Sequence, residues 1–137
     1  MGNGLIIFGI FWMSVNSLLA LRLGLQHHPH VHLLKRLMKQ NEYEEFENHR
    51  SEWEWRKAVH GHQMLMSLVA IVIGLLVPHM TNSSGLYIYI MGTVLMLAPI
   101  LWGIFGTWYF QPLLGLGDIF FGIGIIMSGI AYVKTVF

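Results

Sequence analysis

The stretch AVHGHQMLMSLVAIVIGLLVP, residues 58–78, decides the class of this protein. A helix needs about 20 mostly apolar residues to cross the hydrocarbon core of a membrane, and this stretch meets that length. Three further apolar runs accompany it, at about 4–25, 86–110 and 114–133. Because backbone groups inside lipid must be hydrogen-bonded within the chain, runs of this length predict helices. The sequence therefore predicts an all-α integral membrane protein, a single four-helix bundle over residues 1–137 embedded in a lipid bilayer.

A polar segment at 26–57 separates the first two predicted spans and holds most of the charge. All but one of the eight lysines and arginines lie in or beside it: Arg22, Lys35, Arg36, Lys39, Arg50, Arg56 and Lys57. The positive-inside rule places this first loop in the cytoplasm and both termini outside, in an inner or plasma membrane. Leucines and aromatic residues recur in the loop at helical spacing. We therefore expect a partly helical loop that lies on the membrane surface or prolongs the second span.

The composition excludes several classes of protein. Hydrophobic residues make up 55% of the chain and charged residues 11%, with a formal net charge of +1, so a soluble domain is excluded and nothing suggests a nucleic-acid partner. The chain has no cysteine, which excludes disulfides, thiolate metal sites and iron–sulfur clusters. Short connections at 79–85 and 111–113 predict antiparallel neighbouring helices.

Histidines cluster where the first predicted span ends, at His27, His28, His30 and His32. A string of imidazoles can bind copper, zinc or nickel. On a helix, however, His28 and His32 share one face while His30 does not, and Pro29 interrupts the run. The cluster is therefore either a metal site or a hydrated group of imidazoles at the membrane surface without fixed ligand geometry.

The pair His60 and His62 opens the second predicted span. Two residues apart on a helix, their side chains point about 200° away from each other, so they cannot hold one ion from the same helix. Each has a methionine four residues further on its own face, Met64 and Met66. One interpretation has one histidine hydrogen-bonded to a neighbouring helix or a lipid headgroup, while the other extends its ring toward the membrane surface. The other makes one of them an axial haem ligand or a proton carrier, since ionisable groups within a span mark functional sites.

Other side chains that could take part in catalysis or binding lie at the same level of the predicted bundle as His60. Trp102, Trp108 and Tyr109 lie in the inner half of the third span, and Asp118 opens the fourth. An acid inside a span requires a partner, and we expect Arg22, Arg56 or a histidine to serve. The aromatic residues fit either a site or the aromatic belt at the membrane interface.

At these residues the chain resembles styrene oxide isomerase, a small membrane enzyme with four spans and haem b. The resemblance rests on the order of five pieces, which covers most of the chain outside the first loop. These are Gly2-Asn3-Gly4, Trp55-Arg56-Lys57-Ala58-Val59-His60, Pro78, the tryptophan-glycine-aromatic stretch from Trp102 to Tyr109, and Gly117-Asp118-Ile119-Phe120.

The resemblance implies haem b on His60, with Trp102 nearby, in a homotrimer or other homo-oligomer that holds haem near subunit contacts. It implies that ferric iron acts as a Lewis acid on an apolar epoxide, whose ring opens to a benzylic cation before a hydride shift gives an aldehyde. Trp108 or Tyr109 takes the place of the pocket tyrosine, and Asp118 is a candidate catalytic acid. The chain departs from the pattern at Met66, where the family has a polar amide that orients substrate.

Three functions therefore stay open. The first is a haem-dependent isomerase for a small lipophilic substrate such as an epoxide. The second is a non-catalytic subunit of a respiratory or monooxygenase complex that binds haem or, as a weaker possibility, copper. In that case Met64 or Met66 would be a sixth ligand of the iron, which favours electron transfer. The third is a cofactor-free transporter or packing subunit in which the histidines relay protons.

Overall fold

The computed structural model describes residues 1–107 and 111–136, and for residues 107 and 111–114 the backbone alone. Four α-helices account for nearly all of the described chain: α1 (Gly2–Lys39), α2 (Tyr43–Leu76), α3 (Gly85–Thr107) and α4 (Gln111–Val136). A short 3₁₀ turn, η1 (Val77–His79), follows α2. By length and composition all four helices can cross a membrane. The predicted all-α membrane bundle is confirmed.

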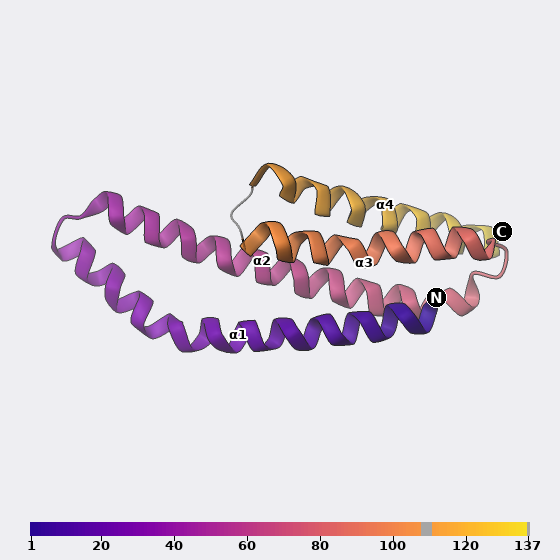
Figure 1. Ribbon diagram of the computed structural model, residues 1–137, viewed down its shortest axis with the longest axis horizontal. Coiled ribbons are helices and arrows are strands. Elements are labelled where there is room, and N and C mark those ends of the chain that lie inside the picture. Colours follow the sequence, from indigo (N-terminus) through magenta and orange to yellow (C-terminus); the bar gives the residue numbers. More distant parts are fainter. Residues whose placement is uncertain (108–110, 137) are drawn as a thin grey trace.

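Consecutive helices run antiparallel, as the short connections predict (Figure 1). Both termini lie at one end of the molecule, and α1 and α2 extend together past α3 and α4 at the other end. The closest pairs are α1 with α2 and α3 with α4, and α2 joins the two pairs through its contact with α3. The connection predicted at 111–113 is instead the first turn of α4, which begins at Gln111.

The polar segment 26–57 is more helical than its composition suggests. It prolongs the first span as well as the second, and only the turn at 40–42 interrupts the two helices. Asn41 makes that turn with a φ of 60°, a left-handed conformation that asparagine tolerates better than most residues. Pro29 lies inside α1 rather than ending it. It leaves the carbonyl of Leu25 without its helical donor, and α1 curves toward α2 in this half (Figure 1).

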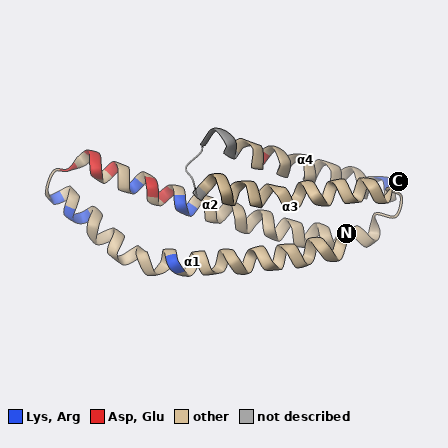
Figure 2. Ribbon diagram, in the orientation of Figure 1, with Lys and Arg blue, Asp and Glu red and all other residues tan. Residues whose placement is uncertain are grey.

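Charged residues gather on the projecting part of α1 and α2 (Figure 2). Three ion pairs connect residues one helical turn apart in α2: Glu47 with Arg50, Glu52 with Arg56, and Glu54 with Lys57. All six side chains are well exposed, so each pair contributes at most about 0.5 kcal/mol to the helix. The remainder of the bundle presents apolar side chains outward, among them Ile7, Leu18, Leu86 and Ile126.

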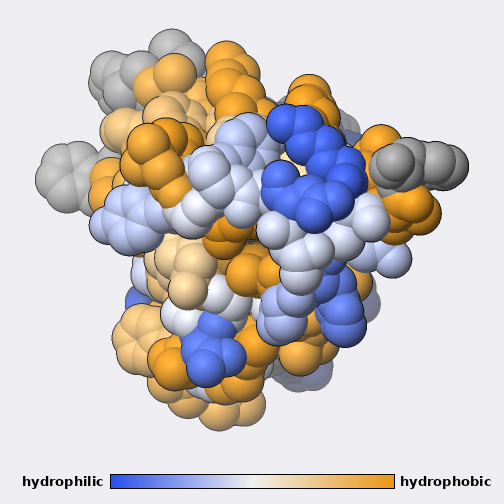
Figure 3. Space-filling view, turned by 90° about the vertical axis from the view of Figure 1, so that its right-hand side faces the viewer, coloured by the Kyte–Doolittle hydropathy of each residue, from blue (hydrophilic) through white to orange (hydrophobic). Residues whose placement is uncertain are grey.

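Two groups of buried side chains hold the bundle together. The larger group lies toward the termini and includes Leu5, Ala70, Met91 and Leu95. The smaller group consists of Val59, Met66, Ala98 and Trp102, and it joins α2 to α3. Seen from the end that holds both termini, hydrophobic side chains dominate the outer rim and hydrophilic ones form patches between them (Figure 3). Such an apolar exterior suits a lipid surrounding.

Candidate ligand pocket between the first two helices

A pocket of about 260 Å³ opens between α1 and α2 beside the end of α3. Its walls repeat at helical spacing on the two facing helices: Asn16, Leu19, Arg22, Leu23 and Gln26 from α1, and Arg56, Val59, His60 and Gln63 from α2, with Gly106 from α3. The indole Nε1 of Trp55 donates a hydrogen bond of 3.1 Å to the Gly106 carbonyl. This bond fixes α3 against α2 at the pocket.

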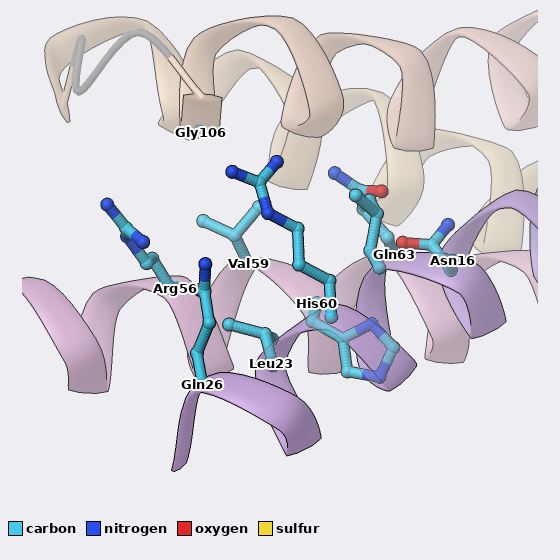
Figure 4. A pocket seen from close by; sticks show the side chains of 10 residues that line it. Asn16, Leu23, Gln26, Arg56, Val59, His60, Gln63 and Gly106 are labelled. Atoms are coloured by element: carbon cyan, nitrogen blue, oxygen red, sulfur yellow. The ribbon is translucent and has the colours of Figure 1, made fainter. Parts of the chain in front are cut away.

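His60 lies midway along the pocket wall (Figure 4). Its side chain is half-buried, and its Nδ1 atom is buried without a hydrogen-bond partner among the described residues. A buried polar atom without a partner costs about 1–3 kcal/mol. Groups of this kind are uncommon in folded proteins, and a ligand, ion or water is a usual explanation.

The two ends of the pocket differ in chemistry (Figure 4). The deep end has two amides, Asn16 and Gln63, whose residues are 0% and 3% exposed. The Nδ2 of Asn16 donates to the Trp12 carbonyl at 2.9 Å, while its buried Oδ1 has no partner in the described part of the chain. The other end has Arg56 and Gln26. The pocket therefore runs from two buried amides to a guanidinium group and a third amide, with His60 between them.

Glycine at position 103 allows the Gln63 amide to lie where it does. A Cβ atom added to Gly103 would stand 3.2 Å from the Nε2 of Gln63 and 3.2 Å from a ring carbon of Trp12. A larger residue would therefore require the amide or the indole to shift by a few tenths of an ångström.

The structure places His62, Trp102 and Asp118 together, away from His60. The imidazole of His62 stacks on the indole of Trp102, with ring centroids 4.3 Å apart and an 11° angle between the planes. The Trp102 Nε1 donates to an Asp118 carboxylate oxygen at 2.9 Å. Among the described residues the partner of Asp118 is thus an indole, and not the arginine or histidine that was expected. Because His60 and His62 point apart, as their spacing predicts, Trp102 adjoins only His62.

One ring nitrogen of His62 forms a hydrogen bond. Its Nδ1 lies 2.8 Å from the Ala58 carbonyl, and since a carbonyl only accepts, Nδ1 carries the proton. In the neutral form of the ring the Nε2 atom then keeps its lone pair, and the residue is exposed.

Neither candidate methionine lines the pocket with His60. Met66 is 2% exposed and packs with Val59, Ala98 and Trp102, while Met64 is half-buried. The place of the family's polar amide is therefore a packing position in this chain. Gln63 and Asn16 put amides into the pocket instead.

The histidine-rich segment forms a second polar pocket of about 250 Å³, lined by Gln26, His30, His49, Glu52, Trp53 and Arg56. The His30 ring stacks on Trp53 with centroids 4.5 Å apart. Burial, and then the neighbouring histidines His49 and His27, lower the pKa of His30 below its ordinary value of 6.5.

His28 and His32 share a face, with their Nε2 atoms 3.3 Å apart. Within the described residues, no group of three or more histidine, aspartate or glutamate side chains is placed to hold a metal ion.

Two expected site residues, Trp108 and Tyr109, lie outside the described residues. Sequence reasoning missed Asn16, Gln63 and Gln26 as parts of the pocket. A signal existed for two of them: Asn16 is a polar residue within an apolar run, and Gln63 follows His60 by three residues and so shares its face.

Comparison with known proteins adds no family to this geometry. No protein-family model matches the chain, and no curated protein and no solved structure matches it.

Proposed function

We propose that this membrane protein binds haem b on His60 and rearranges an apolar epoxide, or a similar small lipophilic substrate, to an aldehyde. The observation that carries the proposal is His60 itself. Its ring lines a pocket inside the bundle, and its buried Nδ1 has no partner among the described residues. The likeness of Trp55–His60 and Gly117–Phe120 to styrene oxide isomerase supplies the reaction class.

The residues of the pocket fit haem in their donor chemistry. Neutral imidazole is a common proximal ligand of haem iron, and His60 places an imidazole near the middle of the pocket wall. From Asn16 to Gln26 the wall of α1 runs about 15 Å, at 1.5 Å per residue, which is comparable with the long axis of a porphyrin. The volume of about 260 Å³ falls just below the usual range for ligand pockets. One subunit would therefore enclose only part of the macrocycle, and a neighbouring subunit of a homotrimer or other homo-oligomer would cover the remainder.

Haem bound here would supply a ferric Lewis acid for the oxygen of the epoxide. The chain's own residues would orient the substrate and keep water away. The Gln63 amide can donate to an oxygen atom in the pocket, in place of the amide that the family has at the Met66 position. Val59, Leu19 and Leu23 make the wall apolar, which limits capture of a cationic intermediate by water. Asp118 lies on the other side of α2 with Trp102, so we assign it a structural role through its hydrogen bond to Trp102.

For orientation we propose that the projecting hairpin of α1 and α2 lies in the cytoplasm. Its many lysines and arginines support this choice through the positive-inside rule, and Figure 2 displays them at one end of the bundle. Both termini then lie on the outer side of an inner or plasma membrane.

A second candidate is a haem- or copper-binding subunit without catalysis. His62 favours it, because ligand histidines usually give their other N–H to an acceptor such as a backbone carbonyl, as His62 does with Ala58. Its exposed position would suit a cofactor shared with another subunit.

Absorption spectra of the purified protein, oxidised and reduced, with iron and copper analysis, test the proposal. We expect a Soret band in the wild type, its loss in His60→Ala and its retention in His62→Ala, a matched substitution on the same helix. A high-spin ferric spectrum with aldehyde formed from styrene oxide supports the isomerase, whereas a low-spin spectrum or bound copper supports the second candidate. A colourless protein without metal, or equal loss of the Soret band in both variants, would overturn the choice of His60.

A further inference from the structure

The ring nitrogens of His28 and His32 lie close together on the polar part of α1. Their Nε2 atoms are 3.3 Å apart, and the ring centroids are 4.4 Å apart with an angle of 62° between the planes. Both residues are exposed, so an ion in water reaches them without any opening of the bundle. Neither histidine lines the pocket that contains His60.

Two imidazole nitrogens at this separation can share either a proton or a metal ion. A direct hydrogen bond would be weak, because 3.3 Å is longer than the common range of about 2.7–3.2 Å for an N–H donor. Each neutral imidazole has one nitrogen with a free lone pair, and the tautomer decides which nitrogen that is. When it is Nε2 in both rings, the pair offers two lone pairs to one ion.

We propose that His28 and His32 bind one divalent transition-metal ion through their two Nε2 atoms, and that Zn²⁺ is the ion that fits best. The bonds from imidazole nitrogen to zinc measure about 2.0–2.1 Å, so two nitrogens 3.3 Å apart would make an angle of about 104–111° at the ion. This range includes the tetrahedral angle that zinc adopts. A square-planar Cu²⁺ site would need about 90° between the same two ligands.

A site with two protein ligands exchanges its ion readily. Within the described residues no group of three or more histidine, aspartate or glutamate side chains is placed to hold a metal, so water or a donor from another molecule would complete the tetrahedron. Structural zinc sites, by contrast, have four protein ligands. Lys35 and Arg36 follow within the next turn, and their charge weakens the attraction for a cation, although water and salt screen it. The site therefore takes up and releases zinc and does not hold the fold together.

Calorimetric titration of the full chain with Zn²⁺, in neutral detergent after treatment with a chelator, tests this proposal. We expect a site whose affinity falls at least about tenfold in His28→Gln and also in His32→Gln, because a second ligand on the same molecule acts at a high effective concentration. The double variant should bind no more weakly than either single variant, since the loss of one ligand already removes the chelate. His27→Gln is the matched control, because it removes an exposed neighbouring histidine that points about 100° away from His28.

Hydrogen exchange shows whether the ion lies on this turn of α1. An ion that joins residues 28 and 32 must leave when the turn between them opens. Zinc at ten times its dissociation constant should therefore slow the exchange of the amides at 32–36 about tenfold. The protection should persist in His27→Gln and disappear in His28→Gln and His32→Gln.

Several outcomes would overturn the proposal. Unchanged zinc affinity in both variants, or a loss in only one of them, would exclude a shared ion, and so would an equal loss in His27→Gln. Zinc binding that leaves the exchange of 32–36 unchanged would indicate an adventitious ion only. Each of these results would leave the haem proposal standing, because that proposal depends on His60.

Discussion

Substitutions of Met66 can distinguish a side chain that only packs the core from one that binds the haem iron. Its side chain is 2% exposed and packs against Val59, Ala98 and Trp102. Truncation to alanine removes three heavy atoms from that cluster and leaves a cavity, at a cost of about 2–5 kcal/mol in buried positions of this kind. Part of the cost is lost van der Waals contact, which is present in a bilayer as well as in water.

We therefore expect Met66→Ala to lower the free energy of unfolding by about 2–5 kcal/mol. Met66→Leu keeps the volume and removes the sulfur, so it should cost less than about 1.5 kcal/mol. Both free energies can be measured by unfolding the protein in mixed micelles with increasing SDS. Met64→Ala is the control, and because Met64 is only half-buried its cost should be smaller.

The absorption spectrum separates the two roles of Met66. If Met66 only packs the core, the leucine variant should keep the spectrum of any bound haem unchanged. A spectrum that changes in the same way in the leucine and alanine variants would show that the thioether binds the iron. An alanine variant no less stable than the Met64 control would refute the packing argument itself.

Two further predictions concern the contact of α2 with α3 and the histidine-rich hairpin. Gly106→Ala should lower the free energy of unfolding by about 1–3 kcal/mol, because a Cβ atom there would stand 2.6 Å from a methyl carbon of Val59. Thermal unfolding would measure it, and an unchanged midpoint would contradict the close approach. Acidification should loosen the hairpin, because His30 has a lowered pKa when folded. The unfolded chain then binds more protons between that pKa and 6.5, so the stability of the folded state decreases as the pH is lowered across this window. Hydrogen exchange at the hairpin, measured from pH 7.5 to about pH 5, should accelerate in the wild type and much less in His30→Gln, and an equal acceleration in both would exclude His30 as the cause.

The sequence by itself determined the spans, because crossing a bilayer depends only on the length and hydropathy of a local run. It also determined relations within one helix. The 3.6-residue period puts His28 and His32 on one face and separates His60 from His62, and the structure has both arrangements. The hairpin at 26–57 was harder to predict, because charged residues on exposed helix turns resemble a loop in composition. Its helicity follows from ion pairs along α2 and from the contact between α1 and α2.

Only the tertiary structure decided which residues meet across helices. Asn16 and Gln63 lie far apart in the chain and share one pocket, while Trp102 adjoins His62 and Asp118 rather than His60. The physical reason is that a membrane helix is apolar on nearly every side, so its hydrophobic pattern does not reveal which face turns inward. Packing of small and large side chains between helices fixes that rotation. Rotation in turn selects which of the two histidines faces the pocket.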